Sequence, residues 1–97
     1  MNQLSRLEKY TLKRSAEVLV IEVEVDGVPD QVMVFKGFSS SLMRPTAFDP
    51  DVPVLPENAV IIQIDRLQSP YSPEAPRYIQ QGLTWDRFQP LLDQVGV

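Results

Sequence analysis

The chain contains no cysteine and no histidine. Without cysteine it can form neither a disulfide nor a thiolate metal site. Without histidine it lacks the usual general base near neutral pH and the commonest metal ligand of proteins. Catalytic arrangements of the Ser-His-Asp and Cys-His kinds cannot be built from this chain alone. We therefore expect a protein that is not an enzyme and that holds no cofactor or metal.

Long apolar runs are also missing. No run approaches the roughly 20 apolar residues that a membrane-spanning helix requires. The first ten residues, MNQLSRLEKY, lack the apolar core of a signal peptide. These absences predict a cytoplasmic protein with no membrane insertion.

Basic residues are scarce beyond the N-terminus. Residues 1–14 carry four basic and one acidic side chain, a formal charge of +3, whereas residues 15–97 carry five basic and twelve acidic ones, a charge of −7. An acidic body argues against nucleic-acid binding, because such binding needs Lys and Arg to neutralise phosphates. The 97 residues, 43% hydrophobic and 23% charged, are typical of one globular domain spanning 1–97.

The clearest structural signal is a hairpin over residues 18–35. Apolar residues alternate on both sides of Asp26-Gly27, a pair that favours a two-residue turn because both positions must accept a positive φ. Such a turn pairs Val25 with Val28. It places on one face, which we expect to be the core, the residues Leu19, Ile21, Val23, Val32 and Val34. Glu22, Glu24 and Gln31 then take the other face, and a longer loop over residues 26–30 is the alternative.

Residues 4–14 are ambiguous between helix and strand. Ser5 and Glu8 fit a capping box, which favours a helix. The surrounding residues alternate in polarity, and Tyr10 and Thr11 suit a strand. Because so short a helix is marginal without packing, we favour a strand.

Two further elements complete the predicted fold. Residues 60–67 predict a central, well-buried strand with Val60, Ile62 and Ile64 on one face. Residues 85–95 predict an amphipathic helix capped by Thr84, in which Pro90 requires a kink or a later start. The prediction is an α+β fold of about four antiparallel strands, able to curl toward a barrel, with a C-terminal helix.

Residues 37–58 lack a regular pattern and contain four prolines. Apolar residues such as Phe38, Leu42 and Phe48 are spread through the segment. Because long structureless loops are uncommon in compact domains, we expect an ordered strap that packs against the sheet.

Two stretches, VFKGFSSSLMRPT at residues 34–46 and GLTW at residues 82–85, resemble a small uncharacterised family of cyanobacterial and chloroplast proteins. The resemblance covers most of the chain. It implies a cell of photosynthetic lineage and a cytoplasmic or stromal location. It implies no catalytic or binding residue, because that family has no established activity.

The best candidate site lies at residues 36–44, with three hydroxyls, two cations and a glycine. Hydroxyls, exposed N–H groups and an Arg fork suit a small anion or nucleotide, although serine-rich turns are also common as structure. The aromatic residues in and beside the loops suit a protein partner instead. The candidate partner-binding residues are Lys36, Phe38, Ser39, Ser40, Ser41, Arg44 and Phe48.

We favour a non-enzymatic interaction or assembly module that binds another protein through this segment and the nearby aromatic residues. The anion or nucleotide site is the alternative. Two pairs of carboxylates, Glu22 with Glu24 and Asp49 with Asp51, could in principle support acid–base chemistry. A solvated strand face and a turn explain these pairs more simply.

Overall fold

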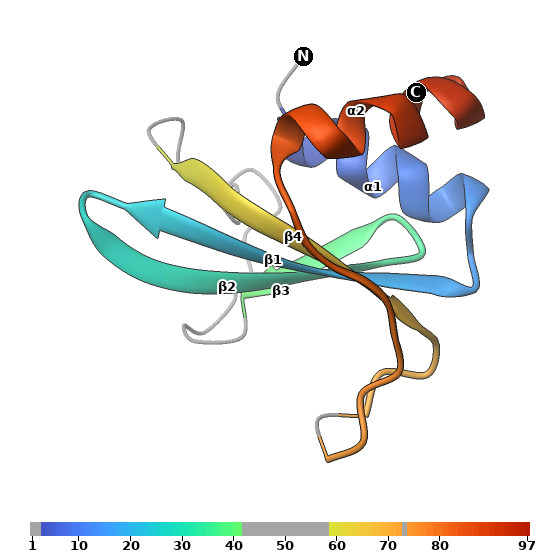
Figure 1. The fold of residues 1–97 in the computed structure, drawn as a ribbon, viewed down its shortest axis with the longest axis horizontal. Coiled ribbons are helices and arrows are strands. Elements are labelled where there is room, and N and C mark those ends of the chain that lie inside the picture. The colour runs from blue at the N-terminus through green and yellow to red at the C-terminus, as the bar shows by residue number, and fades with distance from the viewer. Residues whose placement is uncertain (1–2, 42–58, 73) are drawn as a thin grey trace.

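The computed structural model describes residues 3–41, 59–72 and 74–97. In chain order the elements are α1 (Gln3–Lys13), β1 (Glu17–Val25), β2 (Val28–Phe35), β3 (Phe38–Ser41), β4 (Val60–Gln68), β5 (Tyr78–Leu83) and α2 (Trp85–Val95) (Figure 1). The strands form one antiparallel sheet in the order β3-β2-β1-β4-β5. The predicted α+β fold is confirmed, and the described residues form five strands rather than about four. The sheet that these strands form does not close into a barrel.

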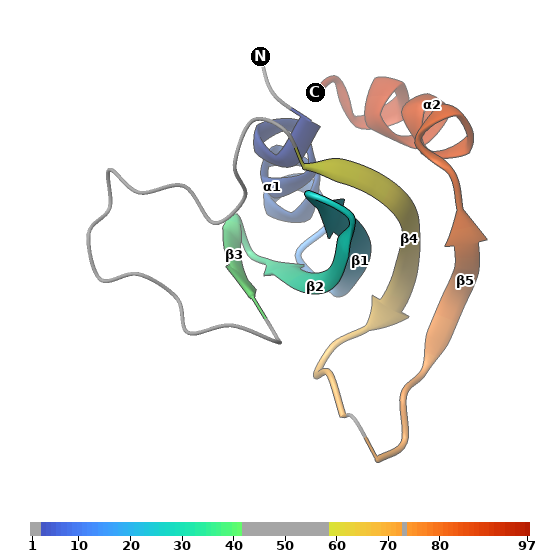
Figure 2. The same ribbon diagram turned by 90° about the vertical axis from the view of Figure 1, so that its left-hand side faces the viewer.

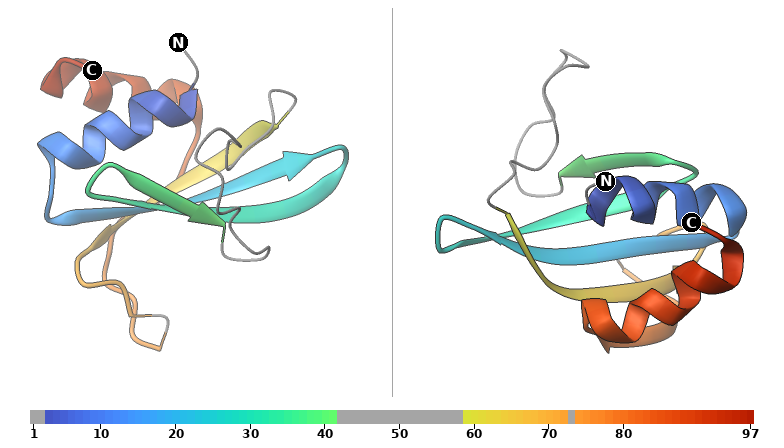
Figure 3. Two further views of the ribbon diagram at one scale, coloured as in Figure 1. Left: turned by 180° about the vertical axis from the view of Figure 1, so that it is seen from behind. Right: turned by 90° about the horizontal axis from the view of Figure 1, so that it is seen from above.

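Both helices lie on the same side of a strongly curved sheet. Figure 2 shows α1 inside the curve and α2 near β4 and β5. Two further views agree that neither helix crosses to the other side (Figure 3). We call the side toward the helices the inner face and the opposite side the outer face. Among the described residues, no helix is long and apolar enough to span a membrane.

The hairpin of β1 and β2 has the predicted register. Val25 pairs with Val28, Ile21 with Val32 and Leu19 with Val34. Asp26 and Gly27 both have positive φ, as a two-residue turn of this type requires. All five predicted core residues of the hairpin are at most 1% exposed and belong to one cluster beneath the helices.

The prediction of a strand at residues 4–14 is wrong, because Gln3–Lys13 forms helix α1. Leu7, Tyr10 and Thr11 are buried, whereas Leu12 is 62% exposed. A strand would have placed Tyr10 and Leu12 on the same face, so the burial follows the helical period. The helix is stable here because it packs on the sheet and on α2, not because of its length.

Strand β4 lies inside the sheet as predicted, between β1 and β5, but its apolar residues do not share one face. Glu22 pairs with Gln63 and the next residue of β1, Val23, pairs with Ile61, so Ile62 is an extra residue in a β-bulge. The bulge places Ile61 against the core together with Ile64. Val60 and Ile62 are 57% and 46% exposed. The expectation that both would be buried is therefore wrong.

The helix α2 begins at Trp85 and is capped by Thr84, whose hydroxyl accepts a hydrogen bond from the N–H of Arg87. Phe88 and Leu92 are fully buried, as the helical spacing predicts. Pro90 lies inside the helix, which begins at Trp85, so of the two alternatives the later start is not found. The proline ring is exposed, and its missing N–H removes one helical hydrogen bond.

Candidate functional site

The structure describes residues 36–41 of the predicted site at residues 36–44. Lys36 and Gly37 form the turn between β2 and β3, and Phe38–Ser41 forms strand β3. This part was expected to be irregular, which is wrong. Strand β3 pairs with β2, with Phe38 opposite Phe35 and Ser41 opposite Val32. Arg44 and Phe48, and most of the predicted strap, lie outside the described residues.

The turn at Lys36-Gly37 is held by helix α1. The Gly37 N–H donates a hydrogen bond of 2.9 Å to Oγ1 of Thr11. A Cβ atom at Gly37 would lie 2.9 Å from the side chain of Leu12. The glycine, whose φ is +83°, is therefore required both for the turn and for close contact with the helix.

Ser39 and Ser40 of β3 point to opposite faces of the sheet. Ser39 lies on the inner face, where its hydroxyl donates a 2.6 Å hydrogen bond to Oε2 of Glu8. Ser40 pairs with Met33, so it lies on the outer face. Because successive strand residues point to opposite faces, Ser39 and Ser40 are not placed to bind one anion together.

The outer face brings together apolar and aromatic residues from all five strands. Val18 pairs with Leu67, Leu67 with Tyr78, and Phe35 with Phe38, which places these residues on this face. At about 4.8 Å per strand, five strands extend across roughly 19 Å. We define the aromatic row as Phe35, Phe38, Tyr71 and Tyr78 with Met33.

A small second core lies beneath the aromatic row. Val18, Val20 and Leu67 are buried there, with Met33, Phe35 and Tyr71 packed against them. Tyr71 comes from the connection between β4 and β5, and it covers part of the outer face that no described helix covers. The row therefore rests on packed side chains.

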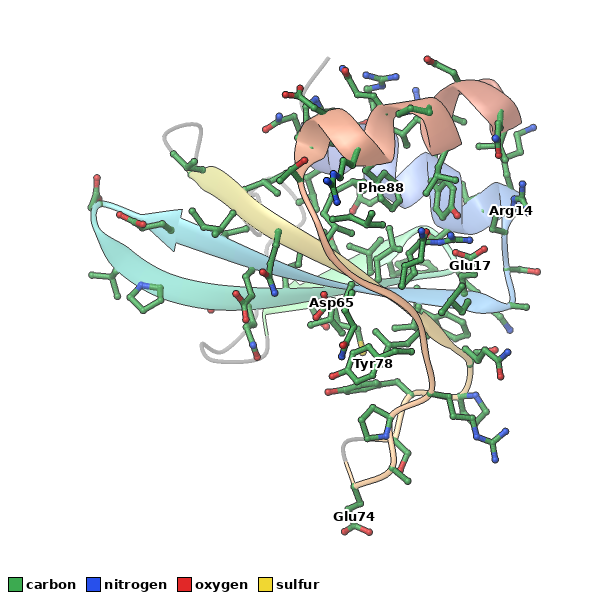
Figure 4. All side chains as sticks on the ribbon, in the orientation of Figure 1. Arg14, Glu17, Asp65, Glu74, Tyr78 and Phe88 are labelled. Atoms are coloured by element: carbon green, nitrogen blue, oxygen red, sulfur yellow. The ribbon has the colours of Figure 1, made fainter. Side chains whose placement is uncertain are left out.

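The outermost members of the row remain accessible. Phe38 is 79% exposed and Tyr78 is 47% exposed. The ammonium group of Lys36 lies 5.2 Å from the centre of the Phe35 ring, within the range of a cation–π interaction. Figure 4 shows Tyr78 and Asp65 on the side of the sheet opposite Phe88 and the helices. Exposed aromatic rings on a rigid support are a favourable starting point for binding.

The other end of the outer face is acidic. Glu22 lies between Gln31 and Gln63, and Glu24 lies between Pro29 and Val60. A concavity of about 500 Å³ is lined there by both carboxylates together with Pro29, Gln31 and Ile62. The predicted solvated face of Glu22 and Glu24 thus adjoins a hollow that the sequence did not indicate. Asp49 and Asp51 lie outside the described residues.

A second polar cluster lies on the inner face, where α1, β1, β4 and β5 meet. Arg66 donates two hydrogen bonds to the carboxylate of Glu17, from Nε at 2.9 Å and from Nη2 at 3.0 Å. The phenol of Tyr10 donates a third, 2.8 Å long, to the same carboxylate. Nη1 of Arg66 also donates to the side chain of Gln80.

The ionisation states of Glu17 and Tyr10 in this cluster are held constant near neutral pH. Burial alone would raise the pKa of Glu17, but the hydrogen bonds from Arg66 and Tyr10 outweigh it and hold the pKa below its usual range. Burial, together with the hydrogen bond to Glu17, raises the pKa of Tyr10 to about 12. Near neutral pH Glu17 stays ionised and Tyr10 stays protonated, which suits a structural lock between α1 and the sheet.

The predicted aromatic residues divide between the two faces. Phe38, Tyr71 and Tyr78 lie at the outer face, whereas Phe88 is buried against Tyr10 with ring centres 5.0 Å apart. Trp85 packs at the edge of the inner core, 5.7 Å from the guanidinium of Arg6. Within the described part of the chain, no three His, Cys, Asp or Glu residues are grouped to hold a metal ion.

The chain belongs to the family described as "Domain of unknown function (DUF7734)", whose model matches residues 4–92. The expected membership of an uncharacterised family is thereby confirmed. No curated protein and no solved structure matches the chain.

Proposed function

We propose that this DUF7734 chain is a non-enzymatic interaction or assembly module that binds another protein through the outer face of its sheet. The observation that carries the proposal is the aromatic row, with Phe38 79% exposed at one edge strand and Tyr78 47% exposed at the other. Aromatic side chains are the most frequent anchors at protein interfaces, because they bury a large area with few rotatable bonds.

The size of the row supports a binding centre with a surrounding rim. One aromatic side chain buries about 150–250 Å². With Phe38 79% and Tyr78 47% exposed, these two rings together provide roughly 250 Å², about a third of the roughly 800 Å² that each partner buries in an interface of standard size. Neighbouring polar residues would complete the contact. Lys36, beside Phe35, and Ser40, beside Met33, are placed to contribute.

The resemblance to cyanobacterial and chloroplast proteins supports a setting in a cell of photosynthetic lineage, in the cytoplasm or the plastid stroma. Arg44 and Phe48 remain part of the proposed partner-binding set, since they follow β3 closely in the chain. We propose no catalytic residue and no nucleic-acid partner.

Site-specific photo-crosslinking in cells that contain the protein tests the proposal. Benzoylphenylalanine replaces Phe38 or Tyr78 in two variants, and Val28 in a control. Val28 is 62% exposed but lies at the tip of the hairpin and outside the outer-face row. We expect the same protein adduct from positions 38 and 78 and none from position 28. No adduct, or equal adducts at all three positions, would contradict the proposal.

A further inference from the structure

We infer that the partner segment is cationic and amphipathic, with its apolar side chains on the aromatic row and its Lys or Arg side chains against Glu22 and Glu24. This inference rests on the proposed function and names the chemistry of the partner.

The charge of the outer face supports a cationic partner. Its strand positions carry three carboxylates, Glu22, Glu24 and Asp65. Asp65 accepts a hydrogen bond from the N–H of Gly82. Among the described residues, the cross-strand neighbours of Glu22 and Glu24 are uncharged, so the sheet itself supplies no cation to them. Complementary charge on a partner would do so and would exclude acidic competitors.

The spacing sets the length of the segment. Glu22 and Glu24 lie four and six residues along β1 from Val18, which corresponds to about 13 and 20 Å. A helix rises 1.5 Å per residue, so about 14 residues reach from the aromatic row to Glu24. A helix of three to four turns, apolar at one end and basic at the other, therefore spans both regions.

The concavity beside the carboxylates fits long basic side chains. Its wall combines Glu22 and Glu24 with the apolar surfaces of Pro29 and Ile62. Lys and Arg bury an aliphatic stem while they keep the charged end near water or a carboxylate. An acidic or purely apolar segment would leave both glutamates without counter-charge in the interface.

Single-stranded nucleic acids also stack on aromatic rings, but the carboxylates of the outer face would repel their phosphates. Lys36 lies next to the row, over the Phe35 ring. The balance of charge on the outer face therefore favours a basic peptide over a nucleic acid.

Calorimetry and NMR titration of the full chain with designed 14-residue peptides test the inference. One probe is a helical peptide with Leu in one half and Lys in the other, the second has Glu in place of every Lys, and the third has the Leu/Lys composition in scrambled order. A single-stranded oligonucleotide is the fourth probe. We expect the ordered Leu/Lys peptide to bind most tightly and to shift the signals of Glu22, Glu24, Phe38 and Tyr78.

The double variant Glu22→Gln/Glu24→Gln should weaken this binding by about four- to twenty-five-fold, because one exposed ion pair contributes roughly two- to fivefold. Glu74→Gln, a control that removes one carboxylate on the far connection between β4 and β5 (Figure 4), should change it less than twofold. Phe38→Ser should weaken it at least fivefold, whereas Val28→Ser should not.

The outcomes separate the two proposals. If the Glu peptide or the oligonucleotide binds as tightly as the Leu/Lys peptide, and Phe38→Ser weakens that binding, the cationic partner is excluded while the outer face remains a binding surface. If Phe38→Ser leaves the binding of every probe unchanged, the proposed function itself is contradicted. Equal binding of the ordered and scrambled Leu/Lys peptides would also overturn the inference, because net charge alone would then suffice.

Discussion

The ion pair of Glu17 with Arg66 allows a quantitative test of the inner face. The two side chains are only 10% and 13% exposed, and two hydrogen bonds of 2.9 and 3.0 Å join them. Removal of one partner from a largely buried ion pair strongly lowers the free energy of unfolding, because the remaining charge has neither water nor its partner around it. The perturbation is to remove each partner singly, as Glu17→Gln and Arg66→Met, and then both together.

The expected magnitude follows from the number of bonds lost. Replacement of Glu17 by Gln keeps one acceptor for Tyr10 but places an amide donor against the guanidinium of Arg66. Hydrogen bonds to charged groups contribute about 1.5–3 kcal/mol each. We therefore expect Glu17→Gln to lower the free energy of unfolding by about 2–3 kcal/mol. Arg66→Met, which leaves the carboxylate unpaired, should lower it by about 3–4 kcal/mol.

Such losses are large for a domain of 97 residues, whose total stability is about 5–15 kcal/mol. In thermal unfolding a loss of 2–3 kcal/mol corresponds to a fall in Tm of about 8–24 °C. Urea unfolding followed by far-UV circular dichroism measures the same change independently. The double variant should lose less than the sum of the single variants, with a coupling energy of about 1.5–3 kcal/mol. If the losses of the two single variants sum to the loss of the double variant within about 0.5 kcal/mol, the two side chains do not form a stabilising ion pair.

The pH dependence provides a second check on the same pair. The pKa of Glu17 is lower in the folded chain than in the unfolded chain, so its contribution is present above the unfolded pKa. That contribution is lost as the pH falls through the folded pKa. Stability of the native chain should therefore decline in acid more steeply than stability of Glu17→Gln. Parallel declines would show that Glu17 is not held ionised by Arg66.

Four other changes have defined outcomes. As the pH rises from 10 to 12, the free energy of unfolding of the native chain should fall by about 2–3 kcal/mol, and Tyr10→Phe should not show this fall. Difference absorbance should show that the phenol of Tyr10 titrates near pH 12. Gly37→Ala should destabilise by about 1–3 kcal/mol in urea, from its φ of +83° and its contact with Leu12. Thr84→Ala should cost about 1 kcal/mol as a lost helix cap, measured by urea unfolding. Pro90→Ala should raise Tm, with a gain of about 1–2 kcal/mol, because it restores a helical hydrogen bond.

The β1–β2 hairpin was predictable because residues that are neighbours in the sequence determine it. A two-residue turn at Asp26-Gly27 sets the register of every residue pair that follows. The cap of α2 at Thr84 is local in the same sense. Helix α1 is not determined locally in this way, because residues 4–14 carry signals for both helix and strand. Packing on the sheet decides between the two. Tyr10 is buried against Phe88, 78 positions further along the chain.

The bulge in β4 could not be predicted from the alternation of apolar and polar residues. Alternation would place Val60, Ile62 and Ile64 together, and the run of isoleucines gives no sign of the extra residue. The register shift lies opposite Glu22 and Val23 of the partner strand, so that Ile61 rather than Ile62 pairs with Val23 and packs against the core. One inserted residue moves every residue of β4 that precedes it to the opposite face of the sheet.

The candidate site was only partly predictable for the same reason. Phe38 could be named from its sequence neighbours, but its place beside Phe35 depends on β3 being a strand. The dipeptide Lys36-Gly37 after an alternating strand was an available signal for that turn, since Gly accepts a positive φ. Tyr78 joins the row only through the pairing of β4 with β5, which contains two irregularities of register. No local pattern encodes that pairing.

The two halves of β1 differ in a way that bears on how the outer face would bind. Residues 17–21 are all buried, so this half is packed on both faces, whereas Glu22 and Glu24 have one open side. The aromatic row therefore sits over the most constrained part of the sheet, and ordering it on binding costs little entropy. The acidic end lies on the hairpin arm that extends beyond the helices (Figure 1), where fewer contacts restrain it. A partner would thus dock on a rigid aromatic base, while its charges meet a more adaptable carboxylate arm.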